Sequence, residues 1–225
     1  MSQRENIVAI LKEKSILKQV IYDNTYAVFI ELKEILQEYA VEVNELLDGQ
    51  DKRIKMVYQD RGKFEAQLQI ASDVLLFSMH TNVFVFDRDN IIWRNSYVEK
   101  NRANAYCGVV NIYNFLSDSL RYNRNEDEGY LIGRLFVNRE KEYLVEGKRQ
   151  VTARHDHFGQ GAINSEAIID IVESAISYAV AEFDLLVPPF DVIKKVSVEQ
   201  MNTKIEHSRL STGKRLGYQY RSDDV

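Results

Sequence analysis

The first fifty residues carry a helical pattern of apolar positions. Ser2 and Glu5 have the Ser-x-x-Glu spacing of a capping box, in which each side chain satisfies a backbone N–H at a helix start. From there to Leu47 the sequence contains no proline and no glycine. Apolar residues recur at intervals of three, four or seven positions, at Leu17, Ile21, Val28, Leu32, Ile35, Tyr39 and Leu46. This spacing predicts one long amphipathic helix that ends near Gly49 and bends at residues 23–25, where three poor helix formers follow one another.

Beyond Gly49 the apolar period shortens to two, which is typical of strands. Phe64, Ala66, Leu68 and Ile70 alternate with polar residues, as in a sheet with one face in water. Runs rich in Val, Ile, Phe and Tyr predict strands at residues 53–59, 63–71, 74–79, 83–86, 91–97, 108–115, 130–138 and 142–146. A helix through Phe64, Leu68, Ala71 and Leu75 is the alternative interpretation of the second run.

A second helix is expected from residue 165 to about Phe183, capped by Asn164 or Ser165 and closed by Pro188-Pro189. The order helix, strands, helix predicts an α+β fold, in which an antiparallel meander of about six to eight strands carries the long N-terminal and the C-terminal helix. Residues 1–190 would form this single domain and residues 191–225 a basic C-terminal extension. The layout resembles that of sensory modules of the GAF and PAS type, a resemblance of architecture that assigns no residue a role.

Composition narrows the class of protein. Of the 225 residues, 45% are hydrophobic, which predicts a folded chain with a real core. The single cysteine, Cys107, excludes an internal disulfide and a cysteine-based zinc cluster. The polar N-terminus and the lack of an apolar run of about 20 residues predict a cytoplasmic protein without a membrane span. A net charge of −5 argues against general binding to a nucleic acid backbone.

Polar residues within the predicted strands suggest a ligand pocket over the sheet. Asn111 and Tyr113 would share one strand face, and Arg134 lies between Ile132 and Phe136. An arginine beside aromatic residues can recognise a carboxylate or phosphate. The alternative is that Arg134 pairs with an aspartate of the chain itself or lies on the wet face of the sheet. His80 interrupts an apolar stretch, where it would be half-buried and would need a partner. We therefore predict His80, Asn111, Tyr113 and Arg134 as ligand-binding residues, provided that they converge.

The segment before the second helix is the most concentrated polar stretch of the chain. His155 and His157, with Asp156 between them, are a candidate metal site, and either histidine is a candidate general base. Gly159 and Gly161 precede a helix N-terminus, where their N–H groups are suited to an anion. The alternative is a solvated loop whose polar side chains bond the backbone locally.

Three functions follow from these observations. The lack of a catalytic signature favours a non-enzymatic regulatory or interaction module that binds a small polar ligand or a protein partner. The broad apolar stripe of the first helix predicts a homodimer or a hetero-assembly through that helix. A metal-dependent hydrolase using His155 and His157 is one alternative. The other is a nucleic-acid-associated protein that acts through the basic tail, where Tyr218 and Tyr220 lie among arginines.

Overall fold

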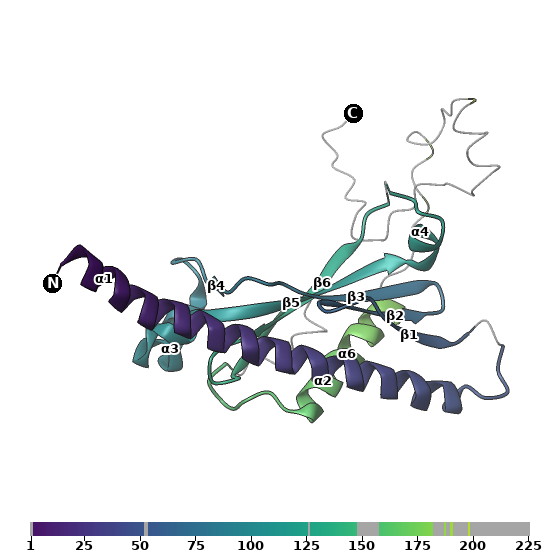
Figure 1. Ribbon diagram of the computed structural model, residues 1–225. Coiled ribbons are helices and arrows are strands. Elements are labelled where there is room, and N and C mark those ends of the chain that lie inside the picture. The colour runs from purple at the N-terminus through teal and green to yellow at the C-terminus, as the bar shows by residue number, and fades with distance from the viewer. Residues whose placement is uncertain are drawn as a thin grey trace.

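The computed structural model describes residues 2–51, 54–125, 127–147 and 158–181, together with Val187, Phe190 and Val198. It confirms the α+β class: a 44-residue N-terminal helix, a seven-stranded antiparallel sheet and a C-terminal helix that packs on both (Figure 1). The elements of the long helix are α1 (Gln3–Ile10), a π-helical turn (Leu11–Ser15) and α2 (Ile16–Leu46). The predicted capping box is present, because Ser2 and Glu5 each bond the other's backbone N–H.

Six of the seven strands lie in the order β1-β2-β3-β5-β6-β7, and the seventh, the short β4, pairs with β5. Their bounds are β1 Met56–Asp60, β2 Glu65–Ile70, β3 Asp73–Met79, β4 Phe84–Val85, β5 Tyr106–Leu116, β6 Tyr130–Val137 and β7 Tyr143–Gly147. The second apolar run is therefore a strand and not a helix. The sheet is a meander interrupted once, because the chain leaves it between β3 and β5.

The two faces of the sheet have different covers. Helix α2 and helix α6 (Ser165–Ala181) pack on one face, where the main core includes Phe29, Phe77 and Ile171. Residues 80–105 cover part of the other face and form a second, smaller core with Cys107, Val109 and Phe136. Because strand residues alternate between faces, Asn111 of β5 and Arg134 of β6 point to this second face, as do Val109 and Phe136.

The strand predicted at residues 91–97 is wrong. This segment contains a 3₁₀ turn (Ile91–Arg94), the short helix α3 (Ser96–Lys100) and, directly after it, a second 3₁₀ turn (Arg102–Ala105). Asn90, Asn95 and Asn101 explain the difference, because each amide oxygen accepts a hydrogen bond from the backbone N–H two residues later. Such local bonds begin turns and helices and compete with a strand ladder.

The long helix is also regular where a bend was expected. Asn24 donates hydrogen bonds to the carbonyls of Asn138 and Arg139, and the Thr25 hydroxyl donates to the Ile21 carbonyl. These side chains therefore bond within and beside the helix instead of interrupting it. The irregularity lies earlier, in the π-helical turn at residues 11–15. The helix at residues 165–181 is capped as expected, since the Asn164 side chain accepts from the Ala167 N–H.

Candidate functional site

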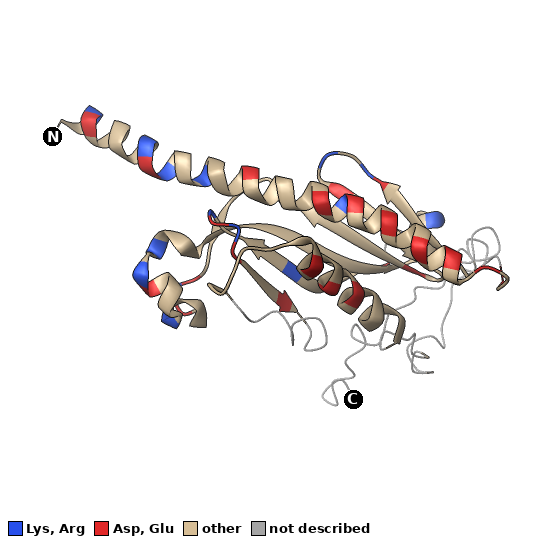
Figure 2. Ribbon diagram, turned by 90° about the horizontal axis from the view of Figure 1, so that it is seen from below, with Lys and Arg blue, Asp and Glu red and all other residues tan. Residues whose placement is uncertain are grey.

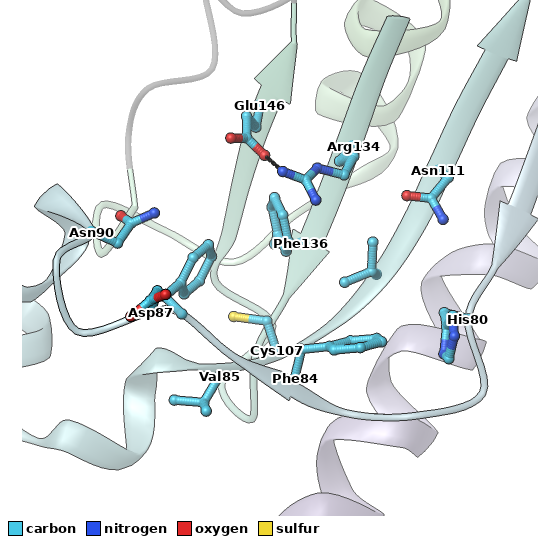
Figure 3. Close-up of a pocket in the computed structure, with 12 residues that line it drawn as sticks. His80, Phe84, Val85, Asp87, Asn90, Cys107, Asn111, Arg134, Phe136 and Glu146 are labelled. Atoms are coloured by element: carbon cyan, nitrogen blue, oxygen red, sulfur yellow. Dashed lines mark hydrogen bonds and ion pairs between the residues drawn. The ribbon is translucent and has the colours of Figure 1, made fainter. Parts of the chain in front are cut away.

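A pocket of about 360 Å³ lies on the second face of the sheet, beside the segment that follows β3 (Figure 3). The strand register aligns three of its polar residues in one row. Asn111 of β5 lies opposite Arg134 of β6, and Arg134 lies opposite Glu146 of β7. The rest of the lining comes from other residues of β5 and β6 and from the segment between β3 and β5. The described residues that line the pocket are His80, Phe84, Val85, Phe86, Asp87, Asn90, Cys107, Val109, Asn111, Arg134, Phe136 and Glu146.

Arg134 is the central cation of this row. Its guanidinium forms an ion pair with Glu146 and lies 5.3 Å from the ring centre of Phe136, two residues along the same strand. The side chains of Arg134 and Glu146 are 41% and 51% exposed. Ion pairs this open to water contribute only about 0–1 kcal/mol, because solvation competes with them. A bound molecule can therefore separate the two charges at little cost.

His80 lies at the opposite side of the pocket from Glu146 (Figure 3). It is exposed and follows the last residue of β3, and so the half-buried central-strand position expected for it is wrong. Its Nδ1 accepts a hydrogen bond of 3.0 Å from the Asn82 N–H, and its ring meets the Phe84 ring edge-on at 4.7 Å. Because Nδ1 accepts, the neutral imidazole carries its proton on Nε2, which makes that nitrogen a donor.

The apolar part of the pocket is aromatic. Phe86 packs against Phe136 with ring centres 4.9 Å apart, while Phe84 and Val85 remain largely exposed. Cys107 is buried beneath them, and burial raises the pKa of its thiol well above the usual value. The thiolate, which is the reactive form, is therefore disfavoured at neutral pH.

The structure brings together three of the four predicted ligand-binding residues. His80, Asn111 and Arg134 line the pocket, whereas Tyr113 is not among its described lining residues. Tyr113 shares the sheet face of Asn111, because the pairing of β5 with β3 is regular, but it lies two residues farther along β5 than the residue opposite Arg134. Its ring lies beside Phe115 instead, with centres 6.4 Å apart.

Sequence reasoning missed Glu146, which only the register of β6 and β7 places beside Arg134. It also missed the contribution of Asp87 and Asn90, which belong to the segment between β4 and the first 3₁₀ turn. The signal for a turn at Asn90 was present, because an asparagine side chain commonly begins a turn by bonding the backbone N–H two residues later.

The N–H groups of Gly159 and Gly161, which were expected to suit an anion, bind the carboxylate of Glu142 from the chain itself. The Glu142 carboxylate accepts hydrogen bonds of 3.0 Å from the N–H groups of both Gly159 and Gly161. This interaction ties the approach to α6 to the turn between β6 and β7. These N–H groups are therefore already engaged within the chain.

The candidate metal residues His155, Asp156 and His157 lie outside the described residues, as does nearly all of the basic tail. In the part of the chain that is described, no three His, Cys, Asp or Glu side chains cluster in a way that suits a metal ion. The hydrolase and nucleic-acid alternatives therefore stay predictions. No described helix is both long and apolar enough to cross a membrane.

The chain was compared with protein-family models, curated proteins and solved structures, and none of them matches it. The resemblance in layout to GAF and PAS modules thus gains no support from these comparisons. The function has to be argued from the geometry of the pocket.

Proposed function

We propose that the chain is a non-enzymatic binding module whose pocket takes a small molecule with a carboxylate, a neighbouring ammonium or amide group, and an apolar body. The row of Asn111, Arg134 and Glu146 across three strands is the observation that carries this proposal. A volume of about 360 Å³ suits a ligand of the size of an amino acid, near the lower end of ligand sites.

The polar row offers complementary groups to such a molecule. Arg134 presents a planar fork of donors that matches a carboxylate in a two-point contact. Glu146, released from Arg134, accepts from an ammonium group. The amide of Asn111, half-buried in the same row, offers both a donor and an acceptor. One weak ion pair of the free protein is thereby exchanged for two contacts with the ligand.

The aromatic wall supports an apolar body. Phe84 is 43% exposed beside the pocket, and a ligand that covers it removes apolar surface from water. His80 packs against the same ring. The binding energy then comes from the aromatic wall and the orientation from the polar row, as is usual for small-molecule sites.

A binding role fits the lining better than covalent catalysis does. Among the described lining residues, Cys107 is the only side chain of the strongly nucleophilic type, and its burial holds it in the thiol form.

The test is calorimetric titration of the full chain with the twenty free amino acids and with the matching carboxylic acids that lack the amine. We expect one binding site with preference for an apolar or aromatic amino acid, and weaker binding of the acid alone. Arg134→Gln should lower the affinity at least about tenfold, because a charged hydrogen-bond pair is lost. Arg61→Gln is the matched control, since Arg61 pairs with Glu65 in a similarly exposed ion pair away from the pocket.

Equal affinity of the Arg134→Gln and wild-type proteins would overturn the assignment of the row as the binding site. Absence of binding by every probe in the panel, with both proteins folded, would remove the proposed ligand class.

A further inference from the structure

The first part of the long helix carries apolar residues that the domain does not cover. No residue of α1 or of the π-helical turn is buried, and Figure 1 shows this end reaching past α3 and the sheet. Its large apolar side chains are 41–59% exposed and are Ile7, Val8, Ile10, Leu11, Ile16 and Val20. Burial begins at Ile21. An apolar surface of this kind on one projecting element marks an interaction site.

The π-helical turn gathers several of these residues on one side. Ile7 and Leu11 are one α-helical turn apart, as are Ile16 and Val20. Leu11 and Ile16 are five residues apart and span the π-helical turn, in which i and i+5 are bonded neighbours. In a regular α-helix a separation of five residues would turn Ile16 away from Leu11. The irregular turn therefore extends one apolar stripe along the projecting helix.

The stripe continues along the outer side of α2. Ala27, Glu34 and Val41 follow Val20 at intervals of seven residues, about two helical turns, and all four are exposed. Glu38 and Glu45 lie one turn from Glu34 and Val41 on the same side and are also exposed. Val41 itself is 56% exposed. At its N-terminal end Arg4, Val8 and Lys12 precede Ile16 at intervals of four residues, beside Ile7 and Leu11. We refer to this whole surface, from Arg4, Ile7, Val8, Leu11 and Lys12 through Ile16 and Val20 to Val41 and Glu45, as the outer stripe.

The two ends of the outer stripe have opposite charge. Arg4 and Lys12 lie one turn before Val8 and Ile16, respectively, while Glu34, Glu38 and Glu45 occupy the other end. In Figure 2, acidic residues recur along the C-terminal half of the helix, and basic residues are concentrated toward its N-terminus. Lys33 in the acidic half does not alter this, because it is buried and pairs with Asp60.

We infer that the outer stripe binds a second copy of this chain, with the two long helices side by side and antiparallel. In that arrangement the basic, apolar end of one helix lies on the acidic end of the other, and two-fold symmetry makes the same contact twice. A parallel arrangement would place glutamates against glutamates. A helix of 44 residues is about 66 Å long, which leaves the projecting segment ample length to reach the partner.

Sedimentation velocity of the full chain over a micromolar concentration series tests this inference. We expect a dimer that dissociates on dilution and with added salt. Lys12→Glu should raise the dissociation constant about tenfold, because it places an acid on the acidic end of the partner. Lys18→Glu is the matched control: it makes the same charge change, but Lys18 lies two residues from Ile16 and Val20, on the opposite side of the helix. It should change the dissociation constant less than about twofold.

Rescue gives a sharper readout. Combining Lys12→Glu with Glu38→Lys restores opposite charges between the two ends and should recover most of the lost affinity. In a mixture of isotopically labelled and unlabelled protein, a carbodiimide should join Lys12 of one copy to Glu38 or Glu45 of the other. A wild-type monomer at all concentrations, or a dimer that Lys12→Glu and Lys18→Glu affect equally, would overturn the inference. So would inter-chain links confined to the two N-terminal segments, which would indicate another arrangement.

Discussion

The ammonium group of Lys33 is buried and donates a hydrogen bond of 2.8 Å to the carboxylate of Asp60, which itself remains largely in water. The two side chains are 10% and 57% exposed. Lys33 also donates to the Gly62 carbonyl and lies 5.4 Å from the ring centre of Phe29. The pair thus connects the middle of α2 to the turn after β1. The buried lysine needs its counter-charge more than the exposed aspartate does, because water solvates the aspartate.

Removing the lysine should cost less than removing the aspartate. In Lys33→Met an apolar side chain of similar length covers Phe29, and Asp60 keeps its solvation and its hydrogen bond from the Gly62 N–H. We expect a loss of no more than about 1 kcal/mol in the free energy of unfolding. In Asp60→Asn the buried ammonium group is left without its counter-charge, and the free energy of unfolding should fall by more than in Lys33→Met. Urea unfolding of both variants checks the order, and a reversed order would contradict the unequal dependence.

Tyr97 and Glu140 form a second pair, this one sensitive to pH. The Tyr97 hydroxyl donates to Glu140 at 2.7 Å and accepts from the Asn138 amide at 2.9 Å. Burial, with the hydrogen bond to Glu140, raises the pKa of Tyr97 well above its usual value. The hydrogen bond from Tyr97 in turn lowers the pKa of Glu140.

These opposite shifts predict a loss of stability at both ends of the pH range. The lowered pKa of Glu140 contributes stability above its unfolded-state pKa of about 4.3, which is lost as the pH falls through the folded value. The raised pKa of Tyr97 contributes stability below about pH 10, which is lost as the pH rises toward the folded value. Tyr97→Phe should flatten both limbs of a plot of unfolding free energy against pH. Unchanged slopes in the variant would show that the pair does not couple folding to protons.

Asn114 is a fully buried amide on the helix-covered face of β5. The side chain is 0% exposed, and neither its oxygen nor its nitrogen has a hydrogen-bond partner among the residues that the structure describes. A buried polar group without hydrogen bonds lowers the free energy of unfolding by about 1–3 kcal/mol, because it has lost its hydration without compensation. Asn114→Leu, which has the same branched skeleton, should therefore raise the free energy of unfolding by about that amount. A lower free energy of unfolding in the variant would show that the amide is satisfied, for instance by an internal water.

The patterns in the sequence were enough to predict the architecture. Seven of the eight predicted strands are present, because alternation in segments such as residues 64–70 is strong and the turns between strands are polar. The strand predicted at residues 91–97 is absent. Its apolar residues favour a strand, but the side chains of Asn90 and Asn95 cap turns there. Local hydrogen-bond competition outweighed strand propensity in that segment.

The pocket was only partly predictable. Asn111 and Arg134 lie on consecutive strands of a meander, which pair with each other. Predicting that these two residues lie side by side therefore required only the register of this one pair. Glu146 required the register of a third strand, which the sequence does not specify to one residue. Tyr113 lies on the same face as Asn111 but two residues farther along β5, and alternation predicts the face of a side chain but not how far a pocket extends along the strand.

Gly159 lies between Glu142, in the turn before β7, and Tyr97 of α3. It has a positive φ of +90°, its N–H donates to Glu142, and a Cβ at this position would lie 2.5 Å from the Cβ of Tyr97. Gly49 has a similar φ of +84°, but a Cβ there would meet no atom within 4 Å. The two glycines therefore share the same backbone requirement and differ in their surroundings.

Replacing each glycine by alanine should separate these two effects. Gly49→Ala carries only the cost of a left-handed backbone, about 1–2 kcal/mol. Gly159→Ala carries the same cost and must also displace Tyr97, whose ring packs edge-on against Phe158 with centres 5.4 Å apart. Because a side chain held in a packed core cannot move freely, we expect an additional loss of about 1–3 kcal/mol. Thermal and urea unfolding measure both variants. Equal losses would mean that Tyr97 shifts without cost and that the contact at Gly159 does not hold the approach to α6 in place.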